Sequence, residues 1–329
     1  MRFYGQLEKR SNYEENDVTI LEAMAQYQNY NIARNLSPHS IEFYKICMES
    51  FKKFYNCNQL CNTITENTIF EYIAYLKQKN TLNDTSINTN IRAIRAMCYY
   101  FMKLGYTAPF QISMLRAEKK IKQTYTDEEL SILLEKPKIS KTTFAEYRNW
   151  VIINYLLATG NRVGTICDLK IQDVDFNAGV IRLSRTKNRH EQIIPISKTL
   201  NDILKDYMKY RKGEGDDYLF CNVNGVRLSE NGLKLAIRKY NQKRGVSKTS
   251  LHLFRHTFAK KWILNGGDVF RLQKMLGHSS MAIVREYVNM FSDDLKRDFD
   301  TFNPLEEFSN KRGEEIKLET KRPRRRMMM

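Results

Sequence analysis

The fold is constrained most by a succession of apolar stripes at helical spacing, each introduced by a helix-start signal. Four such stripes follow one another between residues 17 and 104. Their expected starts are Asp17 or a neighbour, Ser37 with Pro38 in the first helical position, Thr65, and Asp84 or Thr85. Gly105 follows the last stripe, where a helix C-cap is expected. The pattern predicts a helical domain over residues 17–105.

A second set of signals begins with Thr126-Asp127-Glu128-Glu129, which reads as a capping box. The further helices expected from apolar spacing are 143–158, which ends at Gly160, then 198–211 and 229–242. Two β-branched runs, 180–183 and 193–196, follow the turn residues Asn177-Ala178-Gly179 and predict an antiparallel pair. The expected fold class is therefore mainly α with a small antiparallel β-sheet.

The length of 329 residues suits two domains of ordinary size. The expected divisions are an N-terminal extension (1–16), the helical domain (17–105), a basic linker (106–125), a second domain (126–300), and a C-terminal segment with a basic tail (301–329). The linker contains Pro109 and a run of cations without a sustained apolar stripe. It is expected to lie near phosphates, and an exposed linker that touches nothing is the alternative.

A formal charge of +17 is spread along the whole chain, including the stretches 116–122 and 182–189. Such a surplus favours a polyanionic partner, most commonly nucleic acid, although solvated basic faces would give the same composition. No apolar run is long enough to span a membrane, and the first 17 residues lack the apolar core of a signal peptide. We therefore expect a cytoplasmic protein, associated with the nucleoid when it binds DNA.

The six cysteines are scattered along the chain, mostly inside apolar helical patterns. Cys57 and Cys61 form the one close pair, and neither a Cys-x-x-Cys motif nor a neighbouring histidine pair accompanies them. Free, buried thiols are expected. His252 and His256 have a spacing that would also suit a metal, but no third ligand stands near them in the sequence, so no metal is expected.

Several residues that are able to take part in catalysis lie close together in the sequence, between Ser250 and Asn289. His252 and Arg255 are one helical turn apart and so share a face, His278 stands in Leu276-Gly277-His278-Ser279-Ser280, and Tyr287 follows nine residues later. This order and spacing resemble the C-terminal signature of the tyrosine recombinases of the lambda-integrase type. Each residue also has a plain structural interpretation: Tyr287 is one of 19 tyrosines, and His256 is expected to be a core histidine.

Two further segments carry the resemblance. Ala158-Thr159-Gly160-Asn161-Arg162-Val163 resembles the family's first arginine box, in which Arg162 matches the arginine that reaches the scissile phosphate. The family usually has an acidic residue three positions later that orients this arginine, and here Thr165 stands there. The family carries a catalytic lysine on a β-hairpin, and Lys187 is the one lysine between the two predicted strands.

The resemblance implies a metal-free and cofactor-free phosphoryl transfer. Arg162 and Arg255 would clamp the phosphate oxygens, and His252 and His278 would add hydrogen bonds or help take the phenol proton. Tyr287 would attack the phosphorus and Lys187 would protonate the leaving 5′-oxygen, which gives a 3′-phosphotyrosyl intermediate. The remaining DNA-contact candidates are Lys119, Lys120, Lys122, Arg189, Lys234 and Arg238.

The implied protein is a site-specific recombinase or integrase that serves a mobile element. Its N-terminal helices would be a core-binding, SAM-like domain ahead of the catalytic domain. Its partners would be double-stranded DNA with inverted-repeat core sites, further copies of itself (a dimer per site and a tetramer in synapsis) and an accessory directionality factor. The segment 292–308 is expected to dock on a neighbouring copy. There are two alternatives. One is a type IB topoisomerase activity, and the other is a DNA-binding regulator that has lost catalysis, which the presence of Thr165 suggests.

Overall fold

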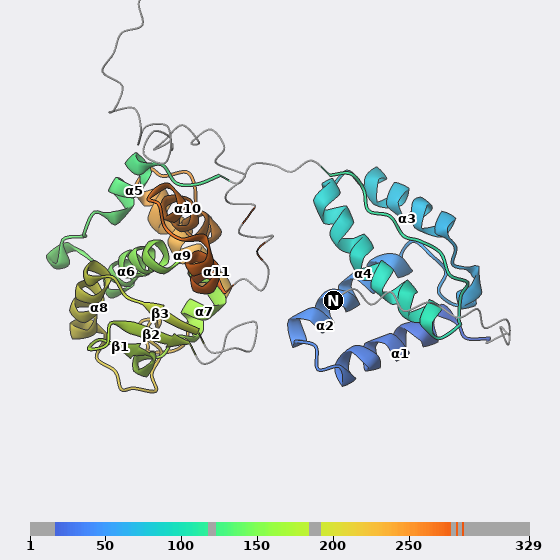
Figure 1. Cartoon of the computed structure of the whole chain (residues 1–329), viewed down its shortest axis with the longest axis horizontal. Coiled ribbons are helices and arrows are strands. Elements are labelled where there is room, and N and C mark those ends of the chain that lie inside the picture. The colour runs from blue at the N-terminus through green and yellow to red at the C-terminus, as the bar shows by residue number, and fades with distance from the viewer. Residues whose placement is uncertain (1–16, 118–122, 184–191, 278–280, 282–284, 286–329) are drawn as a thin grey trace, which may run out of the picture. The chain divides into compact units, whose positions relative to one another are not determined.

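The computed structural model describes residues 17–117, 123–183 and 192–277, together with residues 281 and 285. The chain divides into two compact units, Met1–Lys120 and Ile121–Met329 (Figure 1). Among the described residues, helices dominate and one three-stranded antiparallel sheet lies in the second unit. This agrees with the mainly α fold class expected from the sequence.

Four α-helices make up most of the described first unit. They are α1 (Ile20–Ala33), α2 (Pro38–Lys52), α3 (Glu66–Gln78) and α4 (Asp84–Lys103), with a 3-10 turn, η1 (Cys61–Thr63), before α3. The expected N-caps Ser37 and Thr65 are confirmed, since both side chains accept a backbone N–H of the first turn. The first helix begins after Thr19, two residues beyond Asp17, and Thr19 forms a capping box with Glu22.

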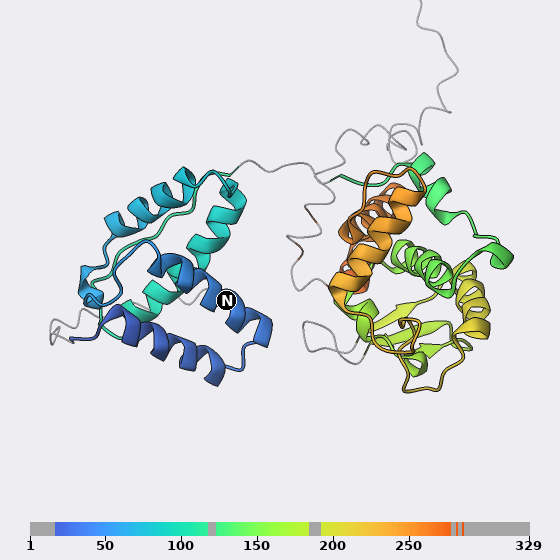
Figure 2. The ribbon, with the colours of Figure 1, turned by 180° about the vertical axis from the view of Figure 1, so that it is seen from behind.

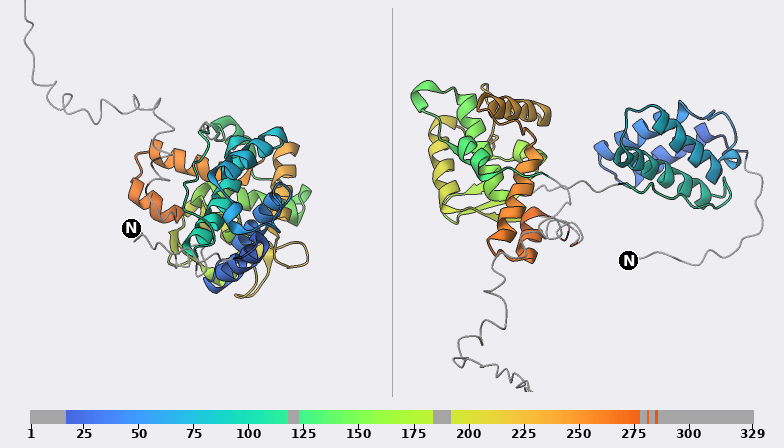
Figure 3. Two further views of the ribbon diagram at one scale, coloured as in Figure 1. Left: turned by 90° about the vertical axis from the view of Figure 1, so that its right-hand side faces the viewer. Right: turned by 90° about the horizontal axis from the view of Figure 1, so that it is seen from above.

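The core of the first unit combines isoleucine side chains with a few aromatic rings. α4 packs against α1, α2 and α3, so that it is the common partner of the bundle (Figure 3). Phe51, Tyr72 and Phe101 are fully buried, and the Tyr72 hydroxyl donates to Ser50 Oγ at 2.9 Å. The bundle therefore satisfies its buried phenol while it excludes water from the rings.

Part of the predicted linker belongs to the core of this unit. Ile112 is buried there, and Phe110 and Met114 pack against the same cluster. Asn88 on α4 bonds the Leu115 backbone in both directions: its Nδ2 donates to the Leu115 carbonyl at 2.9 Å, and its Oδ1 accepts the Leu115 N–H at 2.8 Å. The alternating apolar positions thus hold this stretch against α4, while Lys119, Lys120 and Lys122 lie outside the described residues. The predicted domain boundaries stay predictions.

The second unit contains seven α-helices and three strands among its described residues. The helices are α5 (Asp127–Leu134), α6 (Phe144–Thr159), α7 (Val163–Asp168), α8 (Lys198–Arg211), α9 (Glu230–Lys243), α10 (Leu251–Leu264) and α11 (Val269–Leu276), with 3-10 turns η2 (Ile139–Lys141) and η3 (Ile171–Asp173). The strands are β1 (Val174–Asp175), β2 (Val180–Leu183) and β3 (Gln192–Pro195). The expected capping box at Thr126 and the helix 198–211 are confirmed.

The sheet has the order β1-β2-β3 with both pairs antiparallel. Val180 pairs with Pro195 and Leu183 pairs with Gln192, so the predicted pairing is correct, with the second strand one residue earlier than expected. Asp175 Oδ1 accepts the backbone N–H groups of Asn177 and Ala178, which closes the turn before β2. The residues between β2 and β3 that contain Lys187 and Arg189 lie outside the described residues.

α6 is the central helix of the second unit. It packs against α5, α8, α9 and α10, and it lies between α8 and α10 in both Figure 1 and Figure 2. Its buried side chains surround the whole helix, as expected for a helix enclosed by neighbours. The end of α6 is therefore a fixed point from which the chain turns into α7.

All six cysteines are free and buried, as the sequence predicts. Burial raises the pKa of Cys47 to about 11 and that of Cys98 to about 12, so these thiols stay protonated at neutral pH. No helix among the described residues has the length and apolar character required to cross a membrane.

Candidate active site

Three helix ends meet around the predicted arginines: the C-terminus of α6, the first turn of α10 and the C-terminus of α11. The turn after α6 is built on Gly160, whose left-handed conformation (φ 63°) lets its N–H donate to the Leu156 carbonyl at 2.8 Å. Asn161 is buried and its Nδ2 donates to the Tyr155 hydroxyl at 2.6 Å. The next residue, Arg162, is therefore placed at the N-cap of α7, the helix-start position expected for it.

Arg255 is buried in the first turns of α10 and connects the other two helix ends. Its Nη1 donates to the Gly160 carbonyl and its Nη2 to the Leu276 carbonyl, both at 2.8 Å. These carbonyls lie at helix C-termini, where unpaired acceptors and the helix dipole favour a cation. These two hydrogen bonds to backbone carbonyls help to stabilise the guanidinium, which is only 5% exposed.

Arg162 reaches the same place from α7. It is half-buried, and its Nη2 donates to the Gly277 carbonyl at 3.5 Å. Gly277 is left-handed (φ 59°), and a Cβ there would stand 3.1 Å from Gln192 Oε1 and 3.6 Å from Arg162 Nη1. Glycine at this position lets both side chains approach the end of α11, directly before His278 in the sequence.

Gln192 is a structural residue of the site that sequence reasoning missed. It opens β3, and its Nε2 donates to the carbonyls of Lys274 and Met275, both at 2.6 Å. These bonds tie the β2–β3 hairpin to the last turn of α11. A single glutamine at a strand start carries no sequence signal for such a contact, because the contact depends on two elements far apart in the chain.

His252 lies on α10 at the edge of this group and is exposed. Even so, the protein packed around its ring lowers its pKa below the usual 6.5, and the cations Arg255, Lys234 and Arg162 lower it further. Glu230 acts in the opposite direction. His252 is therefore neutral at pH 7 and is able to accept a proton or to donate its remaining N–H. His256, the predicted core histidine, is half-buried.

The structure thus brings together Arg162, His252 and Arg255. Lys187, His278 and Tyr287 lie outside the described residues, and so do the DNA-contact candidates Lys119, Lys120, Lys122 and Arg189. Lys234 and Arg238 are exposed on α9, and Lys234 belongs to the same electrostatic group as His252. Their role toward DNA stays a prediction.

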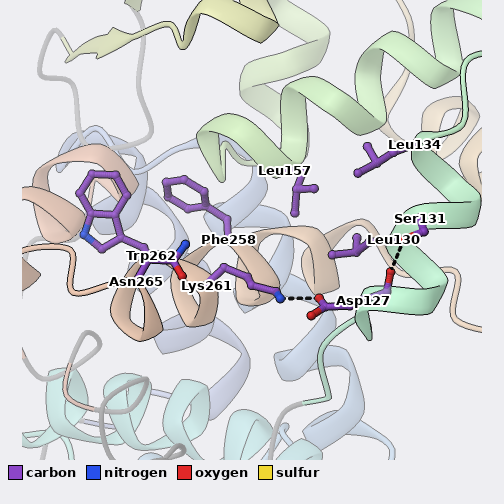
Figure 4. A pocket seen from close by; sticks show the side chains of 9 residues that line it. All are labelled: Asp127, Leu130, Ser131, Leu134, Leu157, Phe258, Lys261, Trp262 and Asn265. Atoms are coloured by element: carbon purple, nitrogen blue, oxygen red, sulfur yellow. Dashed lines mark hydrogen bonds and ion pairs between the residues drawn. The ribbon is translucent and has the colours of Figure 1, made fainter. Parts of the chain in front are cut away.

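An apolar groove lies elsewhere on the second unit, between α5, α6 and α10 (Figure 4). Leu130, Leu134, Leu157, Phe258 and Trp262 supply its apolar walls. An ion pair between Lys261 and Asp127 lies at its border. The groove therefore combines apolar walls with one ion pair at its border.

Two family models match the chain. The model described as the phage integrase family matches residues 123–293, and the model of the phage integrase SAM-like domain matches residues 20–120. Among curated proteins, the tyrosine recombinase XerC of Staphylococcus aureus is 28% identical over 275 residues (81% of this chain, 91% of that protein). The tyrosine recombinase XerD of Staphylococcus epidermidis is 28% identical over 298 residues (87% of this chain, 99% of that protein).

Solved structures show the same fold at lower sequence identity. The Tn1549 transposon integrase in complex with circular intermediate DNA aligns with a TM-score of 0.67 at 21% identity, covering 85% of this chain and 100% of that one. A lambda integrase dimer bound to a core site aligns with a TM-score of 0.67 at 16% identity, covering 84% of this chain and 79% of that one. The two-part architecture is therefore shared with DNA-bound proteins.

Proposed function

The chain belongs to the phage integrase family, and from this premise we propose that six of its residues form one active site around a DNA phosphate. The protein is a site-specific DNA recombinase of the tyrosine class, an enzyme that cuts and rejoins DNA strands. The six residues of the proposal are Arg162, Lys187, His252, Arg255, His278 and Tyr287.

In the proposed reaction the Tyr287 oxygen attacks the phosphorus and the bond from phosphorus to the 5′-oxygen breaks. A phenol with an ordinary pKa of about 10 needs a base and a cationic surround, which the neutral His252 and the two arginines supply. Lys187 gives its proton to the leaving 5′-oxygen. The 3′-phosphotyrosyl bond resembles the bond it replaces in energy, so a 5′-hydroxyl of another strand reverses the step without ATP.

The observation that carries the proposal is the convergence of Arg162 and Arg255 on the end of α11, the element that leads to His278 and Tyr287. Two guanidinium groups on one anion stabilise the charge that builds on the non-bridging oxygens. A DNA phosphate would compete for donors that, in the free protein, bind the Gly277 and Leu276 carbonyls.

A nicked suicide substrate tests the proposal, because the broken strand diffuses away and traps the covalent protein–DNA adduct. We expect an adduct with the unmodified protein and none with Tyr287→Phe, whereas Tyr210→Phe, at an exposed tyrosine of α8, should react normally. Adduct formation by Tyr287→Phe would contradict the assignment. If the unmodified protein forms no adduct, the alternative is favoured: a DNA-binding regulator that has lost catalysis. Thr165, in place of the usual acidic residue, is the feature that suggests this alternative.

The proposal also covers the DNA that the protein binds and the oligomer that it forms on this DNA. Lys119, Lys120, Lys122, Arg189, Lys234 and Arg238 contact the backbone of inverted-repeat core sites, with one dimer on each site and a tetramer in synapsis. The similarity to the Tn1549 transposon integrase supports a role of this protein in the recombination of a mobile element. The proposed location is the cytoplasm, at the nucleoid when DNA is bound, and an accessory directionality factor completes the set of partners.

We also propose that the apolar groove receives residues 292–308 of a neighbouring copy. Leu295, Phe299 and Phe302 of that segment offer apolar side chains that suit walls made by Leu134, Leu157 and Trp262. Leu134→Lys should abolish tetramers on DNA, measured by cross-linking, and should spare single-site binding. Ile193→Lys, at an exposed apolar residue of β3, is the control. Normal tetramers with Leu134→Lys would contradict this docking.

A further inference from the structure

The arginine helix α7 lacks a carboxylate at the position where relatives of this chain are expected to have one. Arg162 caps α7 without a side-chain hydrogen bond to the helix, and Thr165 is the third residue of that helix. Arg162 and Arg255 nevertheless bring two like charges close together at the end of α11, and a nearby carboxylate lowers the electrostatic cost of that arrangement.

Glu230, the first residue of α9, places its carboxylate beside the first turn of α7. Its Oε1 lies 3.0 Å from the place where a Cβ on Gly164 would stand. Gly164 thus leaves room for the carboxylate against the first turn of α7. At the other end of α7, Asp168 pairs with Arg227 at 2.6 Å, so the segment 227–230 lies beside both ends of α7 and binds one of them.

Glu230 also lies among the charged groups that surround His252. Arg162, Arg255 and Lys234 all disfavour the protonated imidazole, and Glu230 favours it. Lys234 Nζ lies 3.7 Å from Glu230 Oε2, one helical turn along α9. These groups come from α7, α9 and α10, the three elements that supply the described part of the site.

We propose that Glu230 is a positioning residue of the strand-cutting reaction, which supplies from α9 the negative charge that α7 lacks at Thr165. Its carboxylate balances the cations around His252 and keeps Lys234 and the start of α7 in place until DNA enters. The inference rests on the proposed function, since it assigns a role within the same reaction.

The test uses Glu230→Gln in the full-length protein, which removes the charge and keeps the size of the side chain. The matched control is Glu66→Gln, because Glu66 likewise opens a helix behind a Thr or Ser cap, but in the other unit. NMR titration follows His252, one of five histidines, and a His252→Gln variant assigns its signal. We expect the His252 pKa to fall further in Glu230→Gln, because a nearby carboxylate that raises it is lost, and to stay the same in Glu66→Gln as in the unmodified protein.

The rate of adduct formation on the suicide substrate gives the second readout. We expect Glu230→Gln to slow it about 10-fold at pH 7, an effect near the lower limit for electrostatic residues around a reacting phosphate. Thr165→Glu in the same variant should restore the rate, because it returns a carboxylate to the site from α7. A role of Glu230 in folding alone would leave the double variant slow.

The outcomes separate the two proposals. An unmodified protein that forms no adduct overturns the proposed function and, with it, the catalytic role of Glu230. An unmodified protein that reacts, together with Glu230→Gln that reacts at the same rate and shows the same His252 titration, overturns the assignment of Glu230 alone. A slow Glu230→Gln that Thr165→Glu does not rescue also contradicts it.

Discussion

Arg162 and Arg255 donate hydrogen bonds to the carbonyls of two consecutive residues, Gly277 and Leu276. The two arginines come from different helices, and the carbonyls belong to the end of a third. That end carries the negative pole of the helix dipole and unpaired acceptors, so it holds two cations side by side in the absence of DNA. The same guanidinium groups are thereby oriented toward the part of the chain that leads to Tyr287.

Arg255→Lys should impair both stability and reaction. A lysine carries one point charge and cannot reach the Gly160 and Leu276 carbonyls in the fork geometry of a guanidinium. We expect a loss of about 1–3 kcal/mol in the free energy of unfolding and a fall of about 10²-fold in adduct formation. Urea unfolding and the suicide substrate measure the two effects. Arg271→Lys, at an exposed position of α11, is the control, and equal behaviour of both variants would refute this role of Arg255.

Gly160→Ala should destabilise the second unit through both backbone and packing. The residue has φ 63°, and an added Cβ would stand 2.5 Å from Phe258 Cδ1 and 2.8 Å from Leu276 Cδ2. Left-handed strain and overpacking together predict a loss of about 2–5 kcal/mol. Gly225 also has a positive φ, but a Cβ added there would have no other atom within 4 Å. For Gly225→Ala we therefore expect a loss of only about 1–2 kcal/mol in the free energy of unfolding.

The unfolding of this unit is followed by tryptophan fluorescence, because both tryptophans, Trp150 and Trp262, belong to it. Losses of the same size in Gly160→Ala and Gly225→Ala would show that the contacts with Phe258 and Leu276 do not matter.

Gln192→Ala should separate DNA binding from catalysis. The change removes both bonds from β3 to the last turn of α11 and leaves the exposed cations of α9 untouched. We expect adduct formation to fall about 10-fold through misplacement of catalytic groups, while the affinity for a core site, measured by gel shift, stays within a factor of two of the unmodified protein. Gln172→Ala, whose side chain bonds exposed Asp216, is the control. A normal rate with Gln192→Ala would exclude this coupling.

Acid should weaken the second unit through Asp206 on α8. Hydrogen bonds from Lys136 and Tyr147 lower the pKa of this carboxyl from 3.8 to about 2. Because the folded protein binds the proton less tightly than the unfolded chain, the stabilisation is present above about pH 4 and is lost as the pH falls toward 2. After a discount for solvent screening it amounts to about 1 kcal/mol.

The melting temperature measured between pH 6 and pH 3 checks this prediction. It should fall less steeply in Asp206→Asn than in the unmodified protein. Asp202→Asn, at an exposed position of the same helix, is the control. Parallel curves for Asp206→Asn and the unmodified protein would rule out the role of Asp206.

The helix starts could be predicted because their signals are local. Ser37, Thr65 and Thr126 act on residues three positions away, and the structure confirms all three caps. The first start was predicted less sharply, at Asp17 or a neighbour, although Thr19 and Glu22 have the spacing of the capping box that the structure shows. Likewise, the alternation of Phe110, Ile112 and Met114 is an extended apolar pattern that the proline and the basic run obscured.

The site could be predicted only in part. Arg162, His252 and Arg255 were identified through a resemblance, and the structure shows that they lie together. The contacts of Gln192 and Glu230 could not be predicted, because each acts on an element distant in the sequence and neither belongs to a spaced motif. Such contacts are determined by the packing of helices, which the periodicity of a single segment does not encode.

Mass spectrometry of the trapped adduct tests the central claim most directly. Trypsin cuts after Arg285 and Lys296, and the peptide between these cuts contains Tyr287 as its one tyrosine. After nuclease digestion of the DNA, the account predicts that this peptide carries a nucleotide linked through its 3′-phosphate to Tyr287. A nucleotide on any other peptide of the chain would contradict the assignment of Tyr287 as the nucleophile.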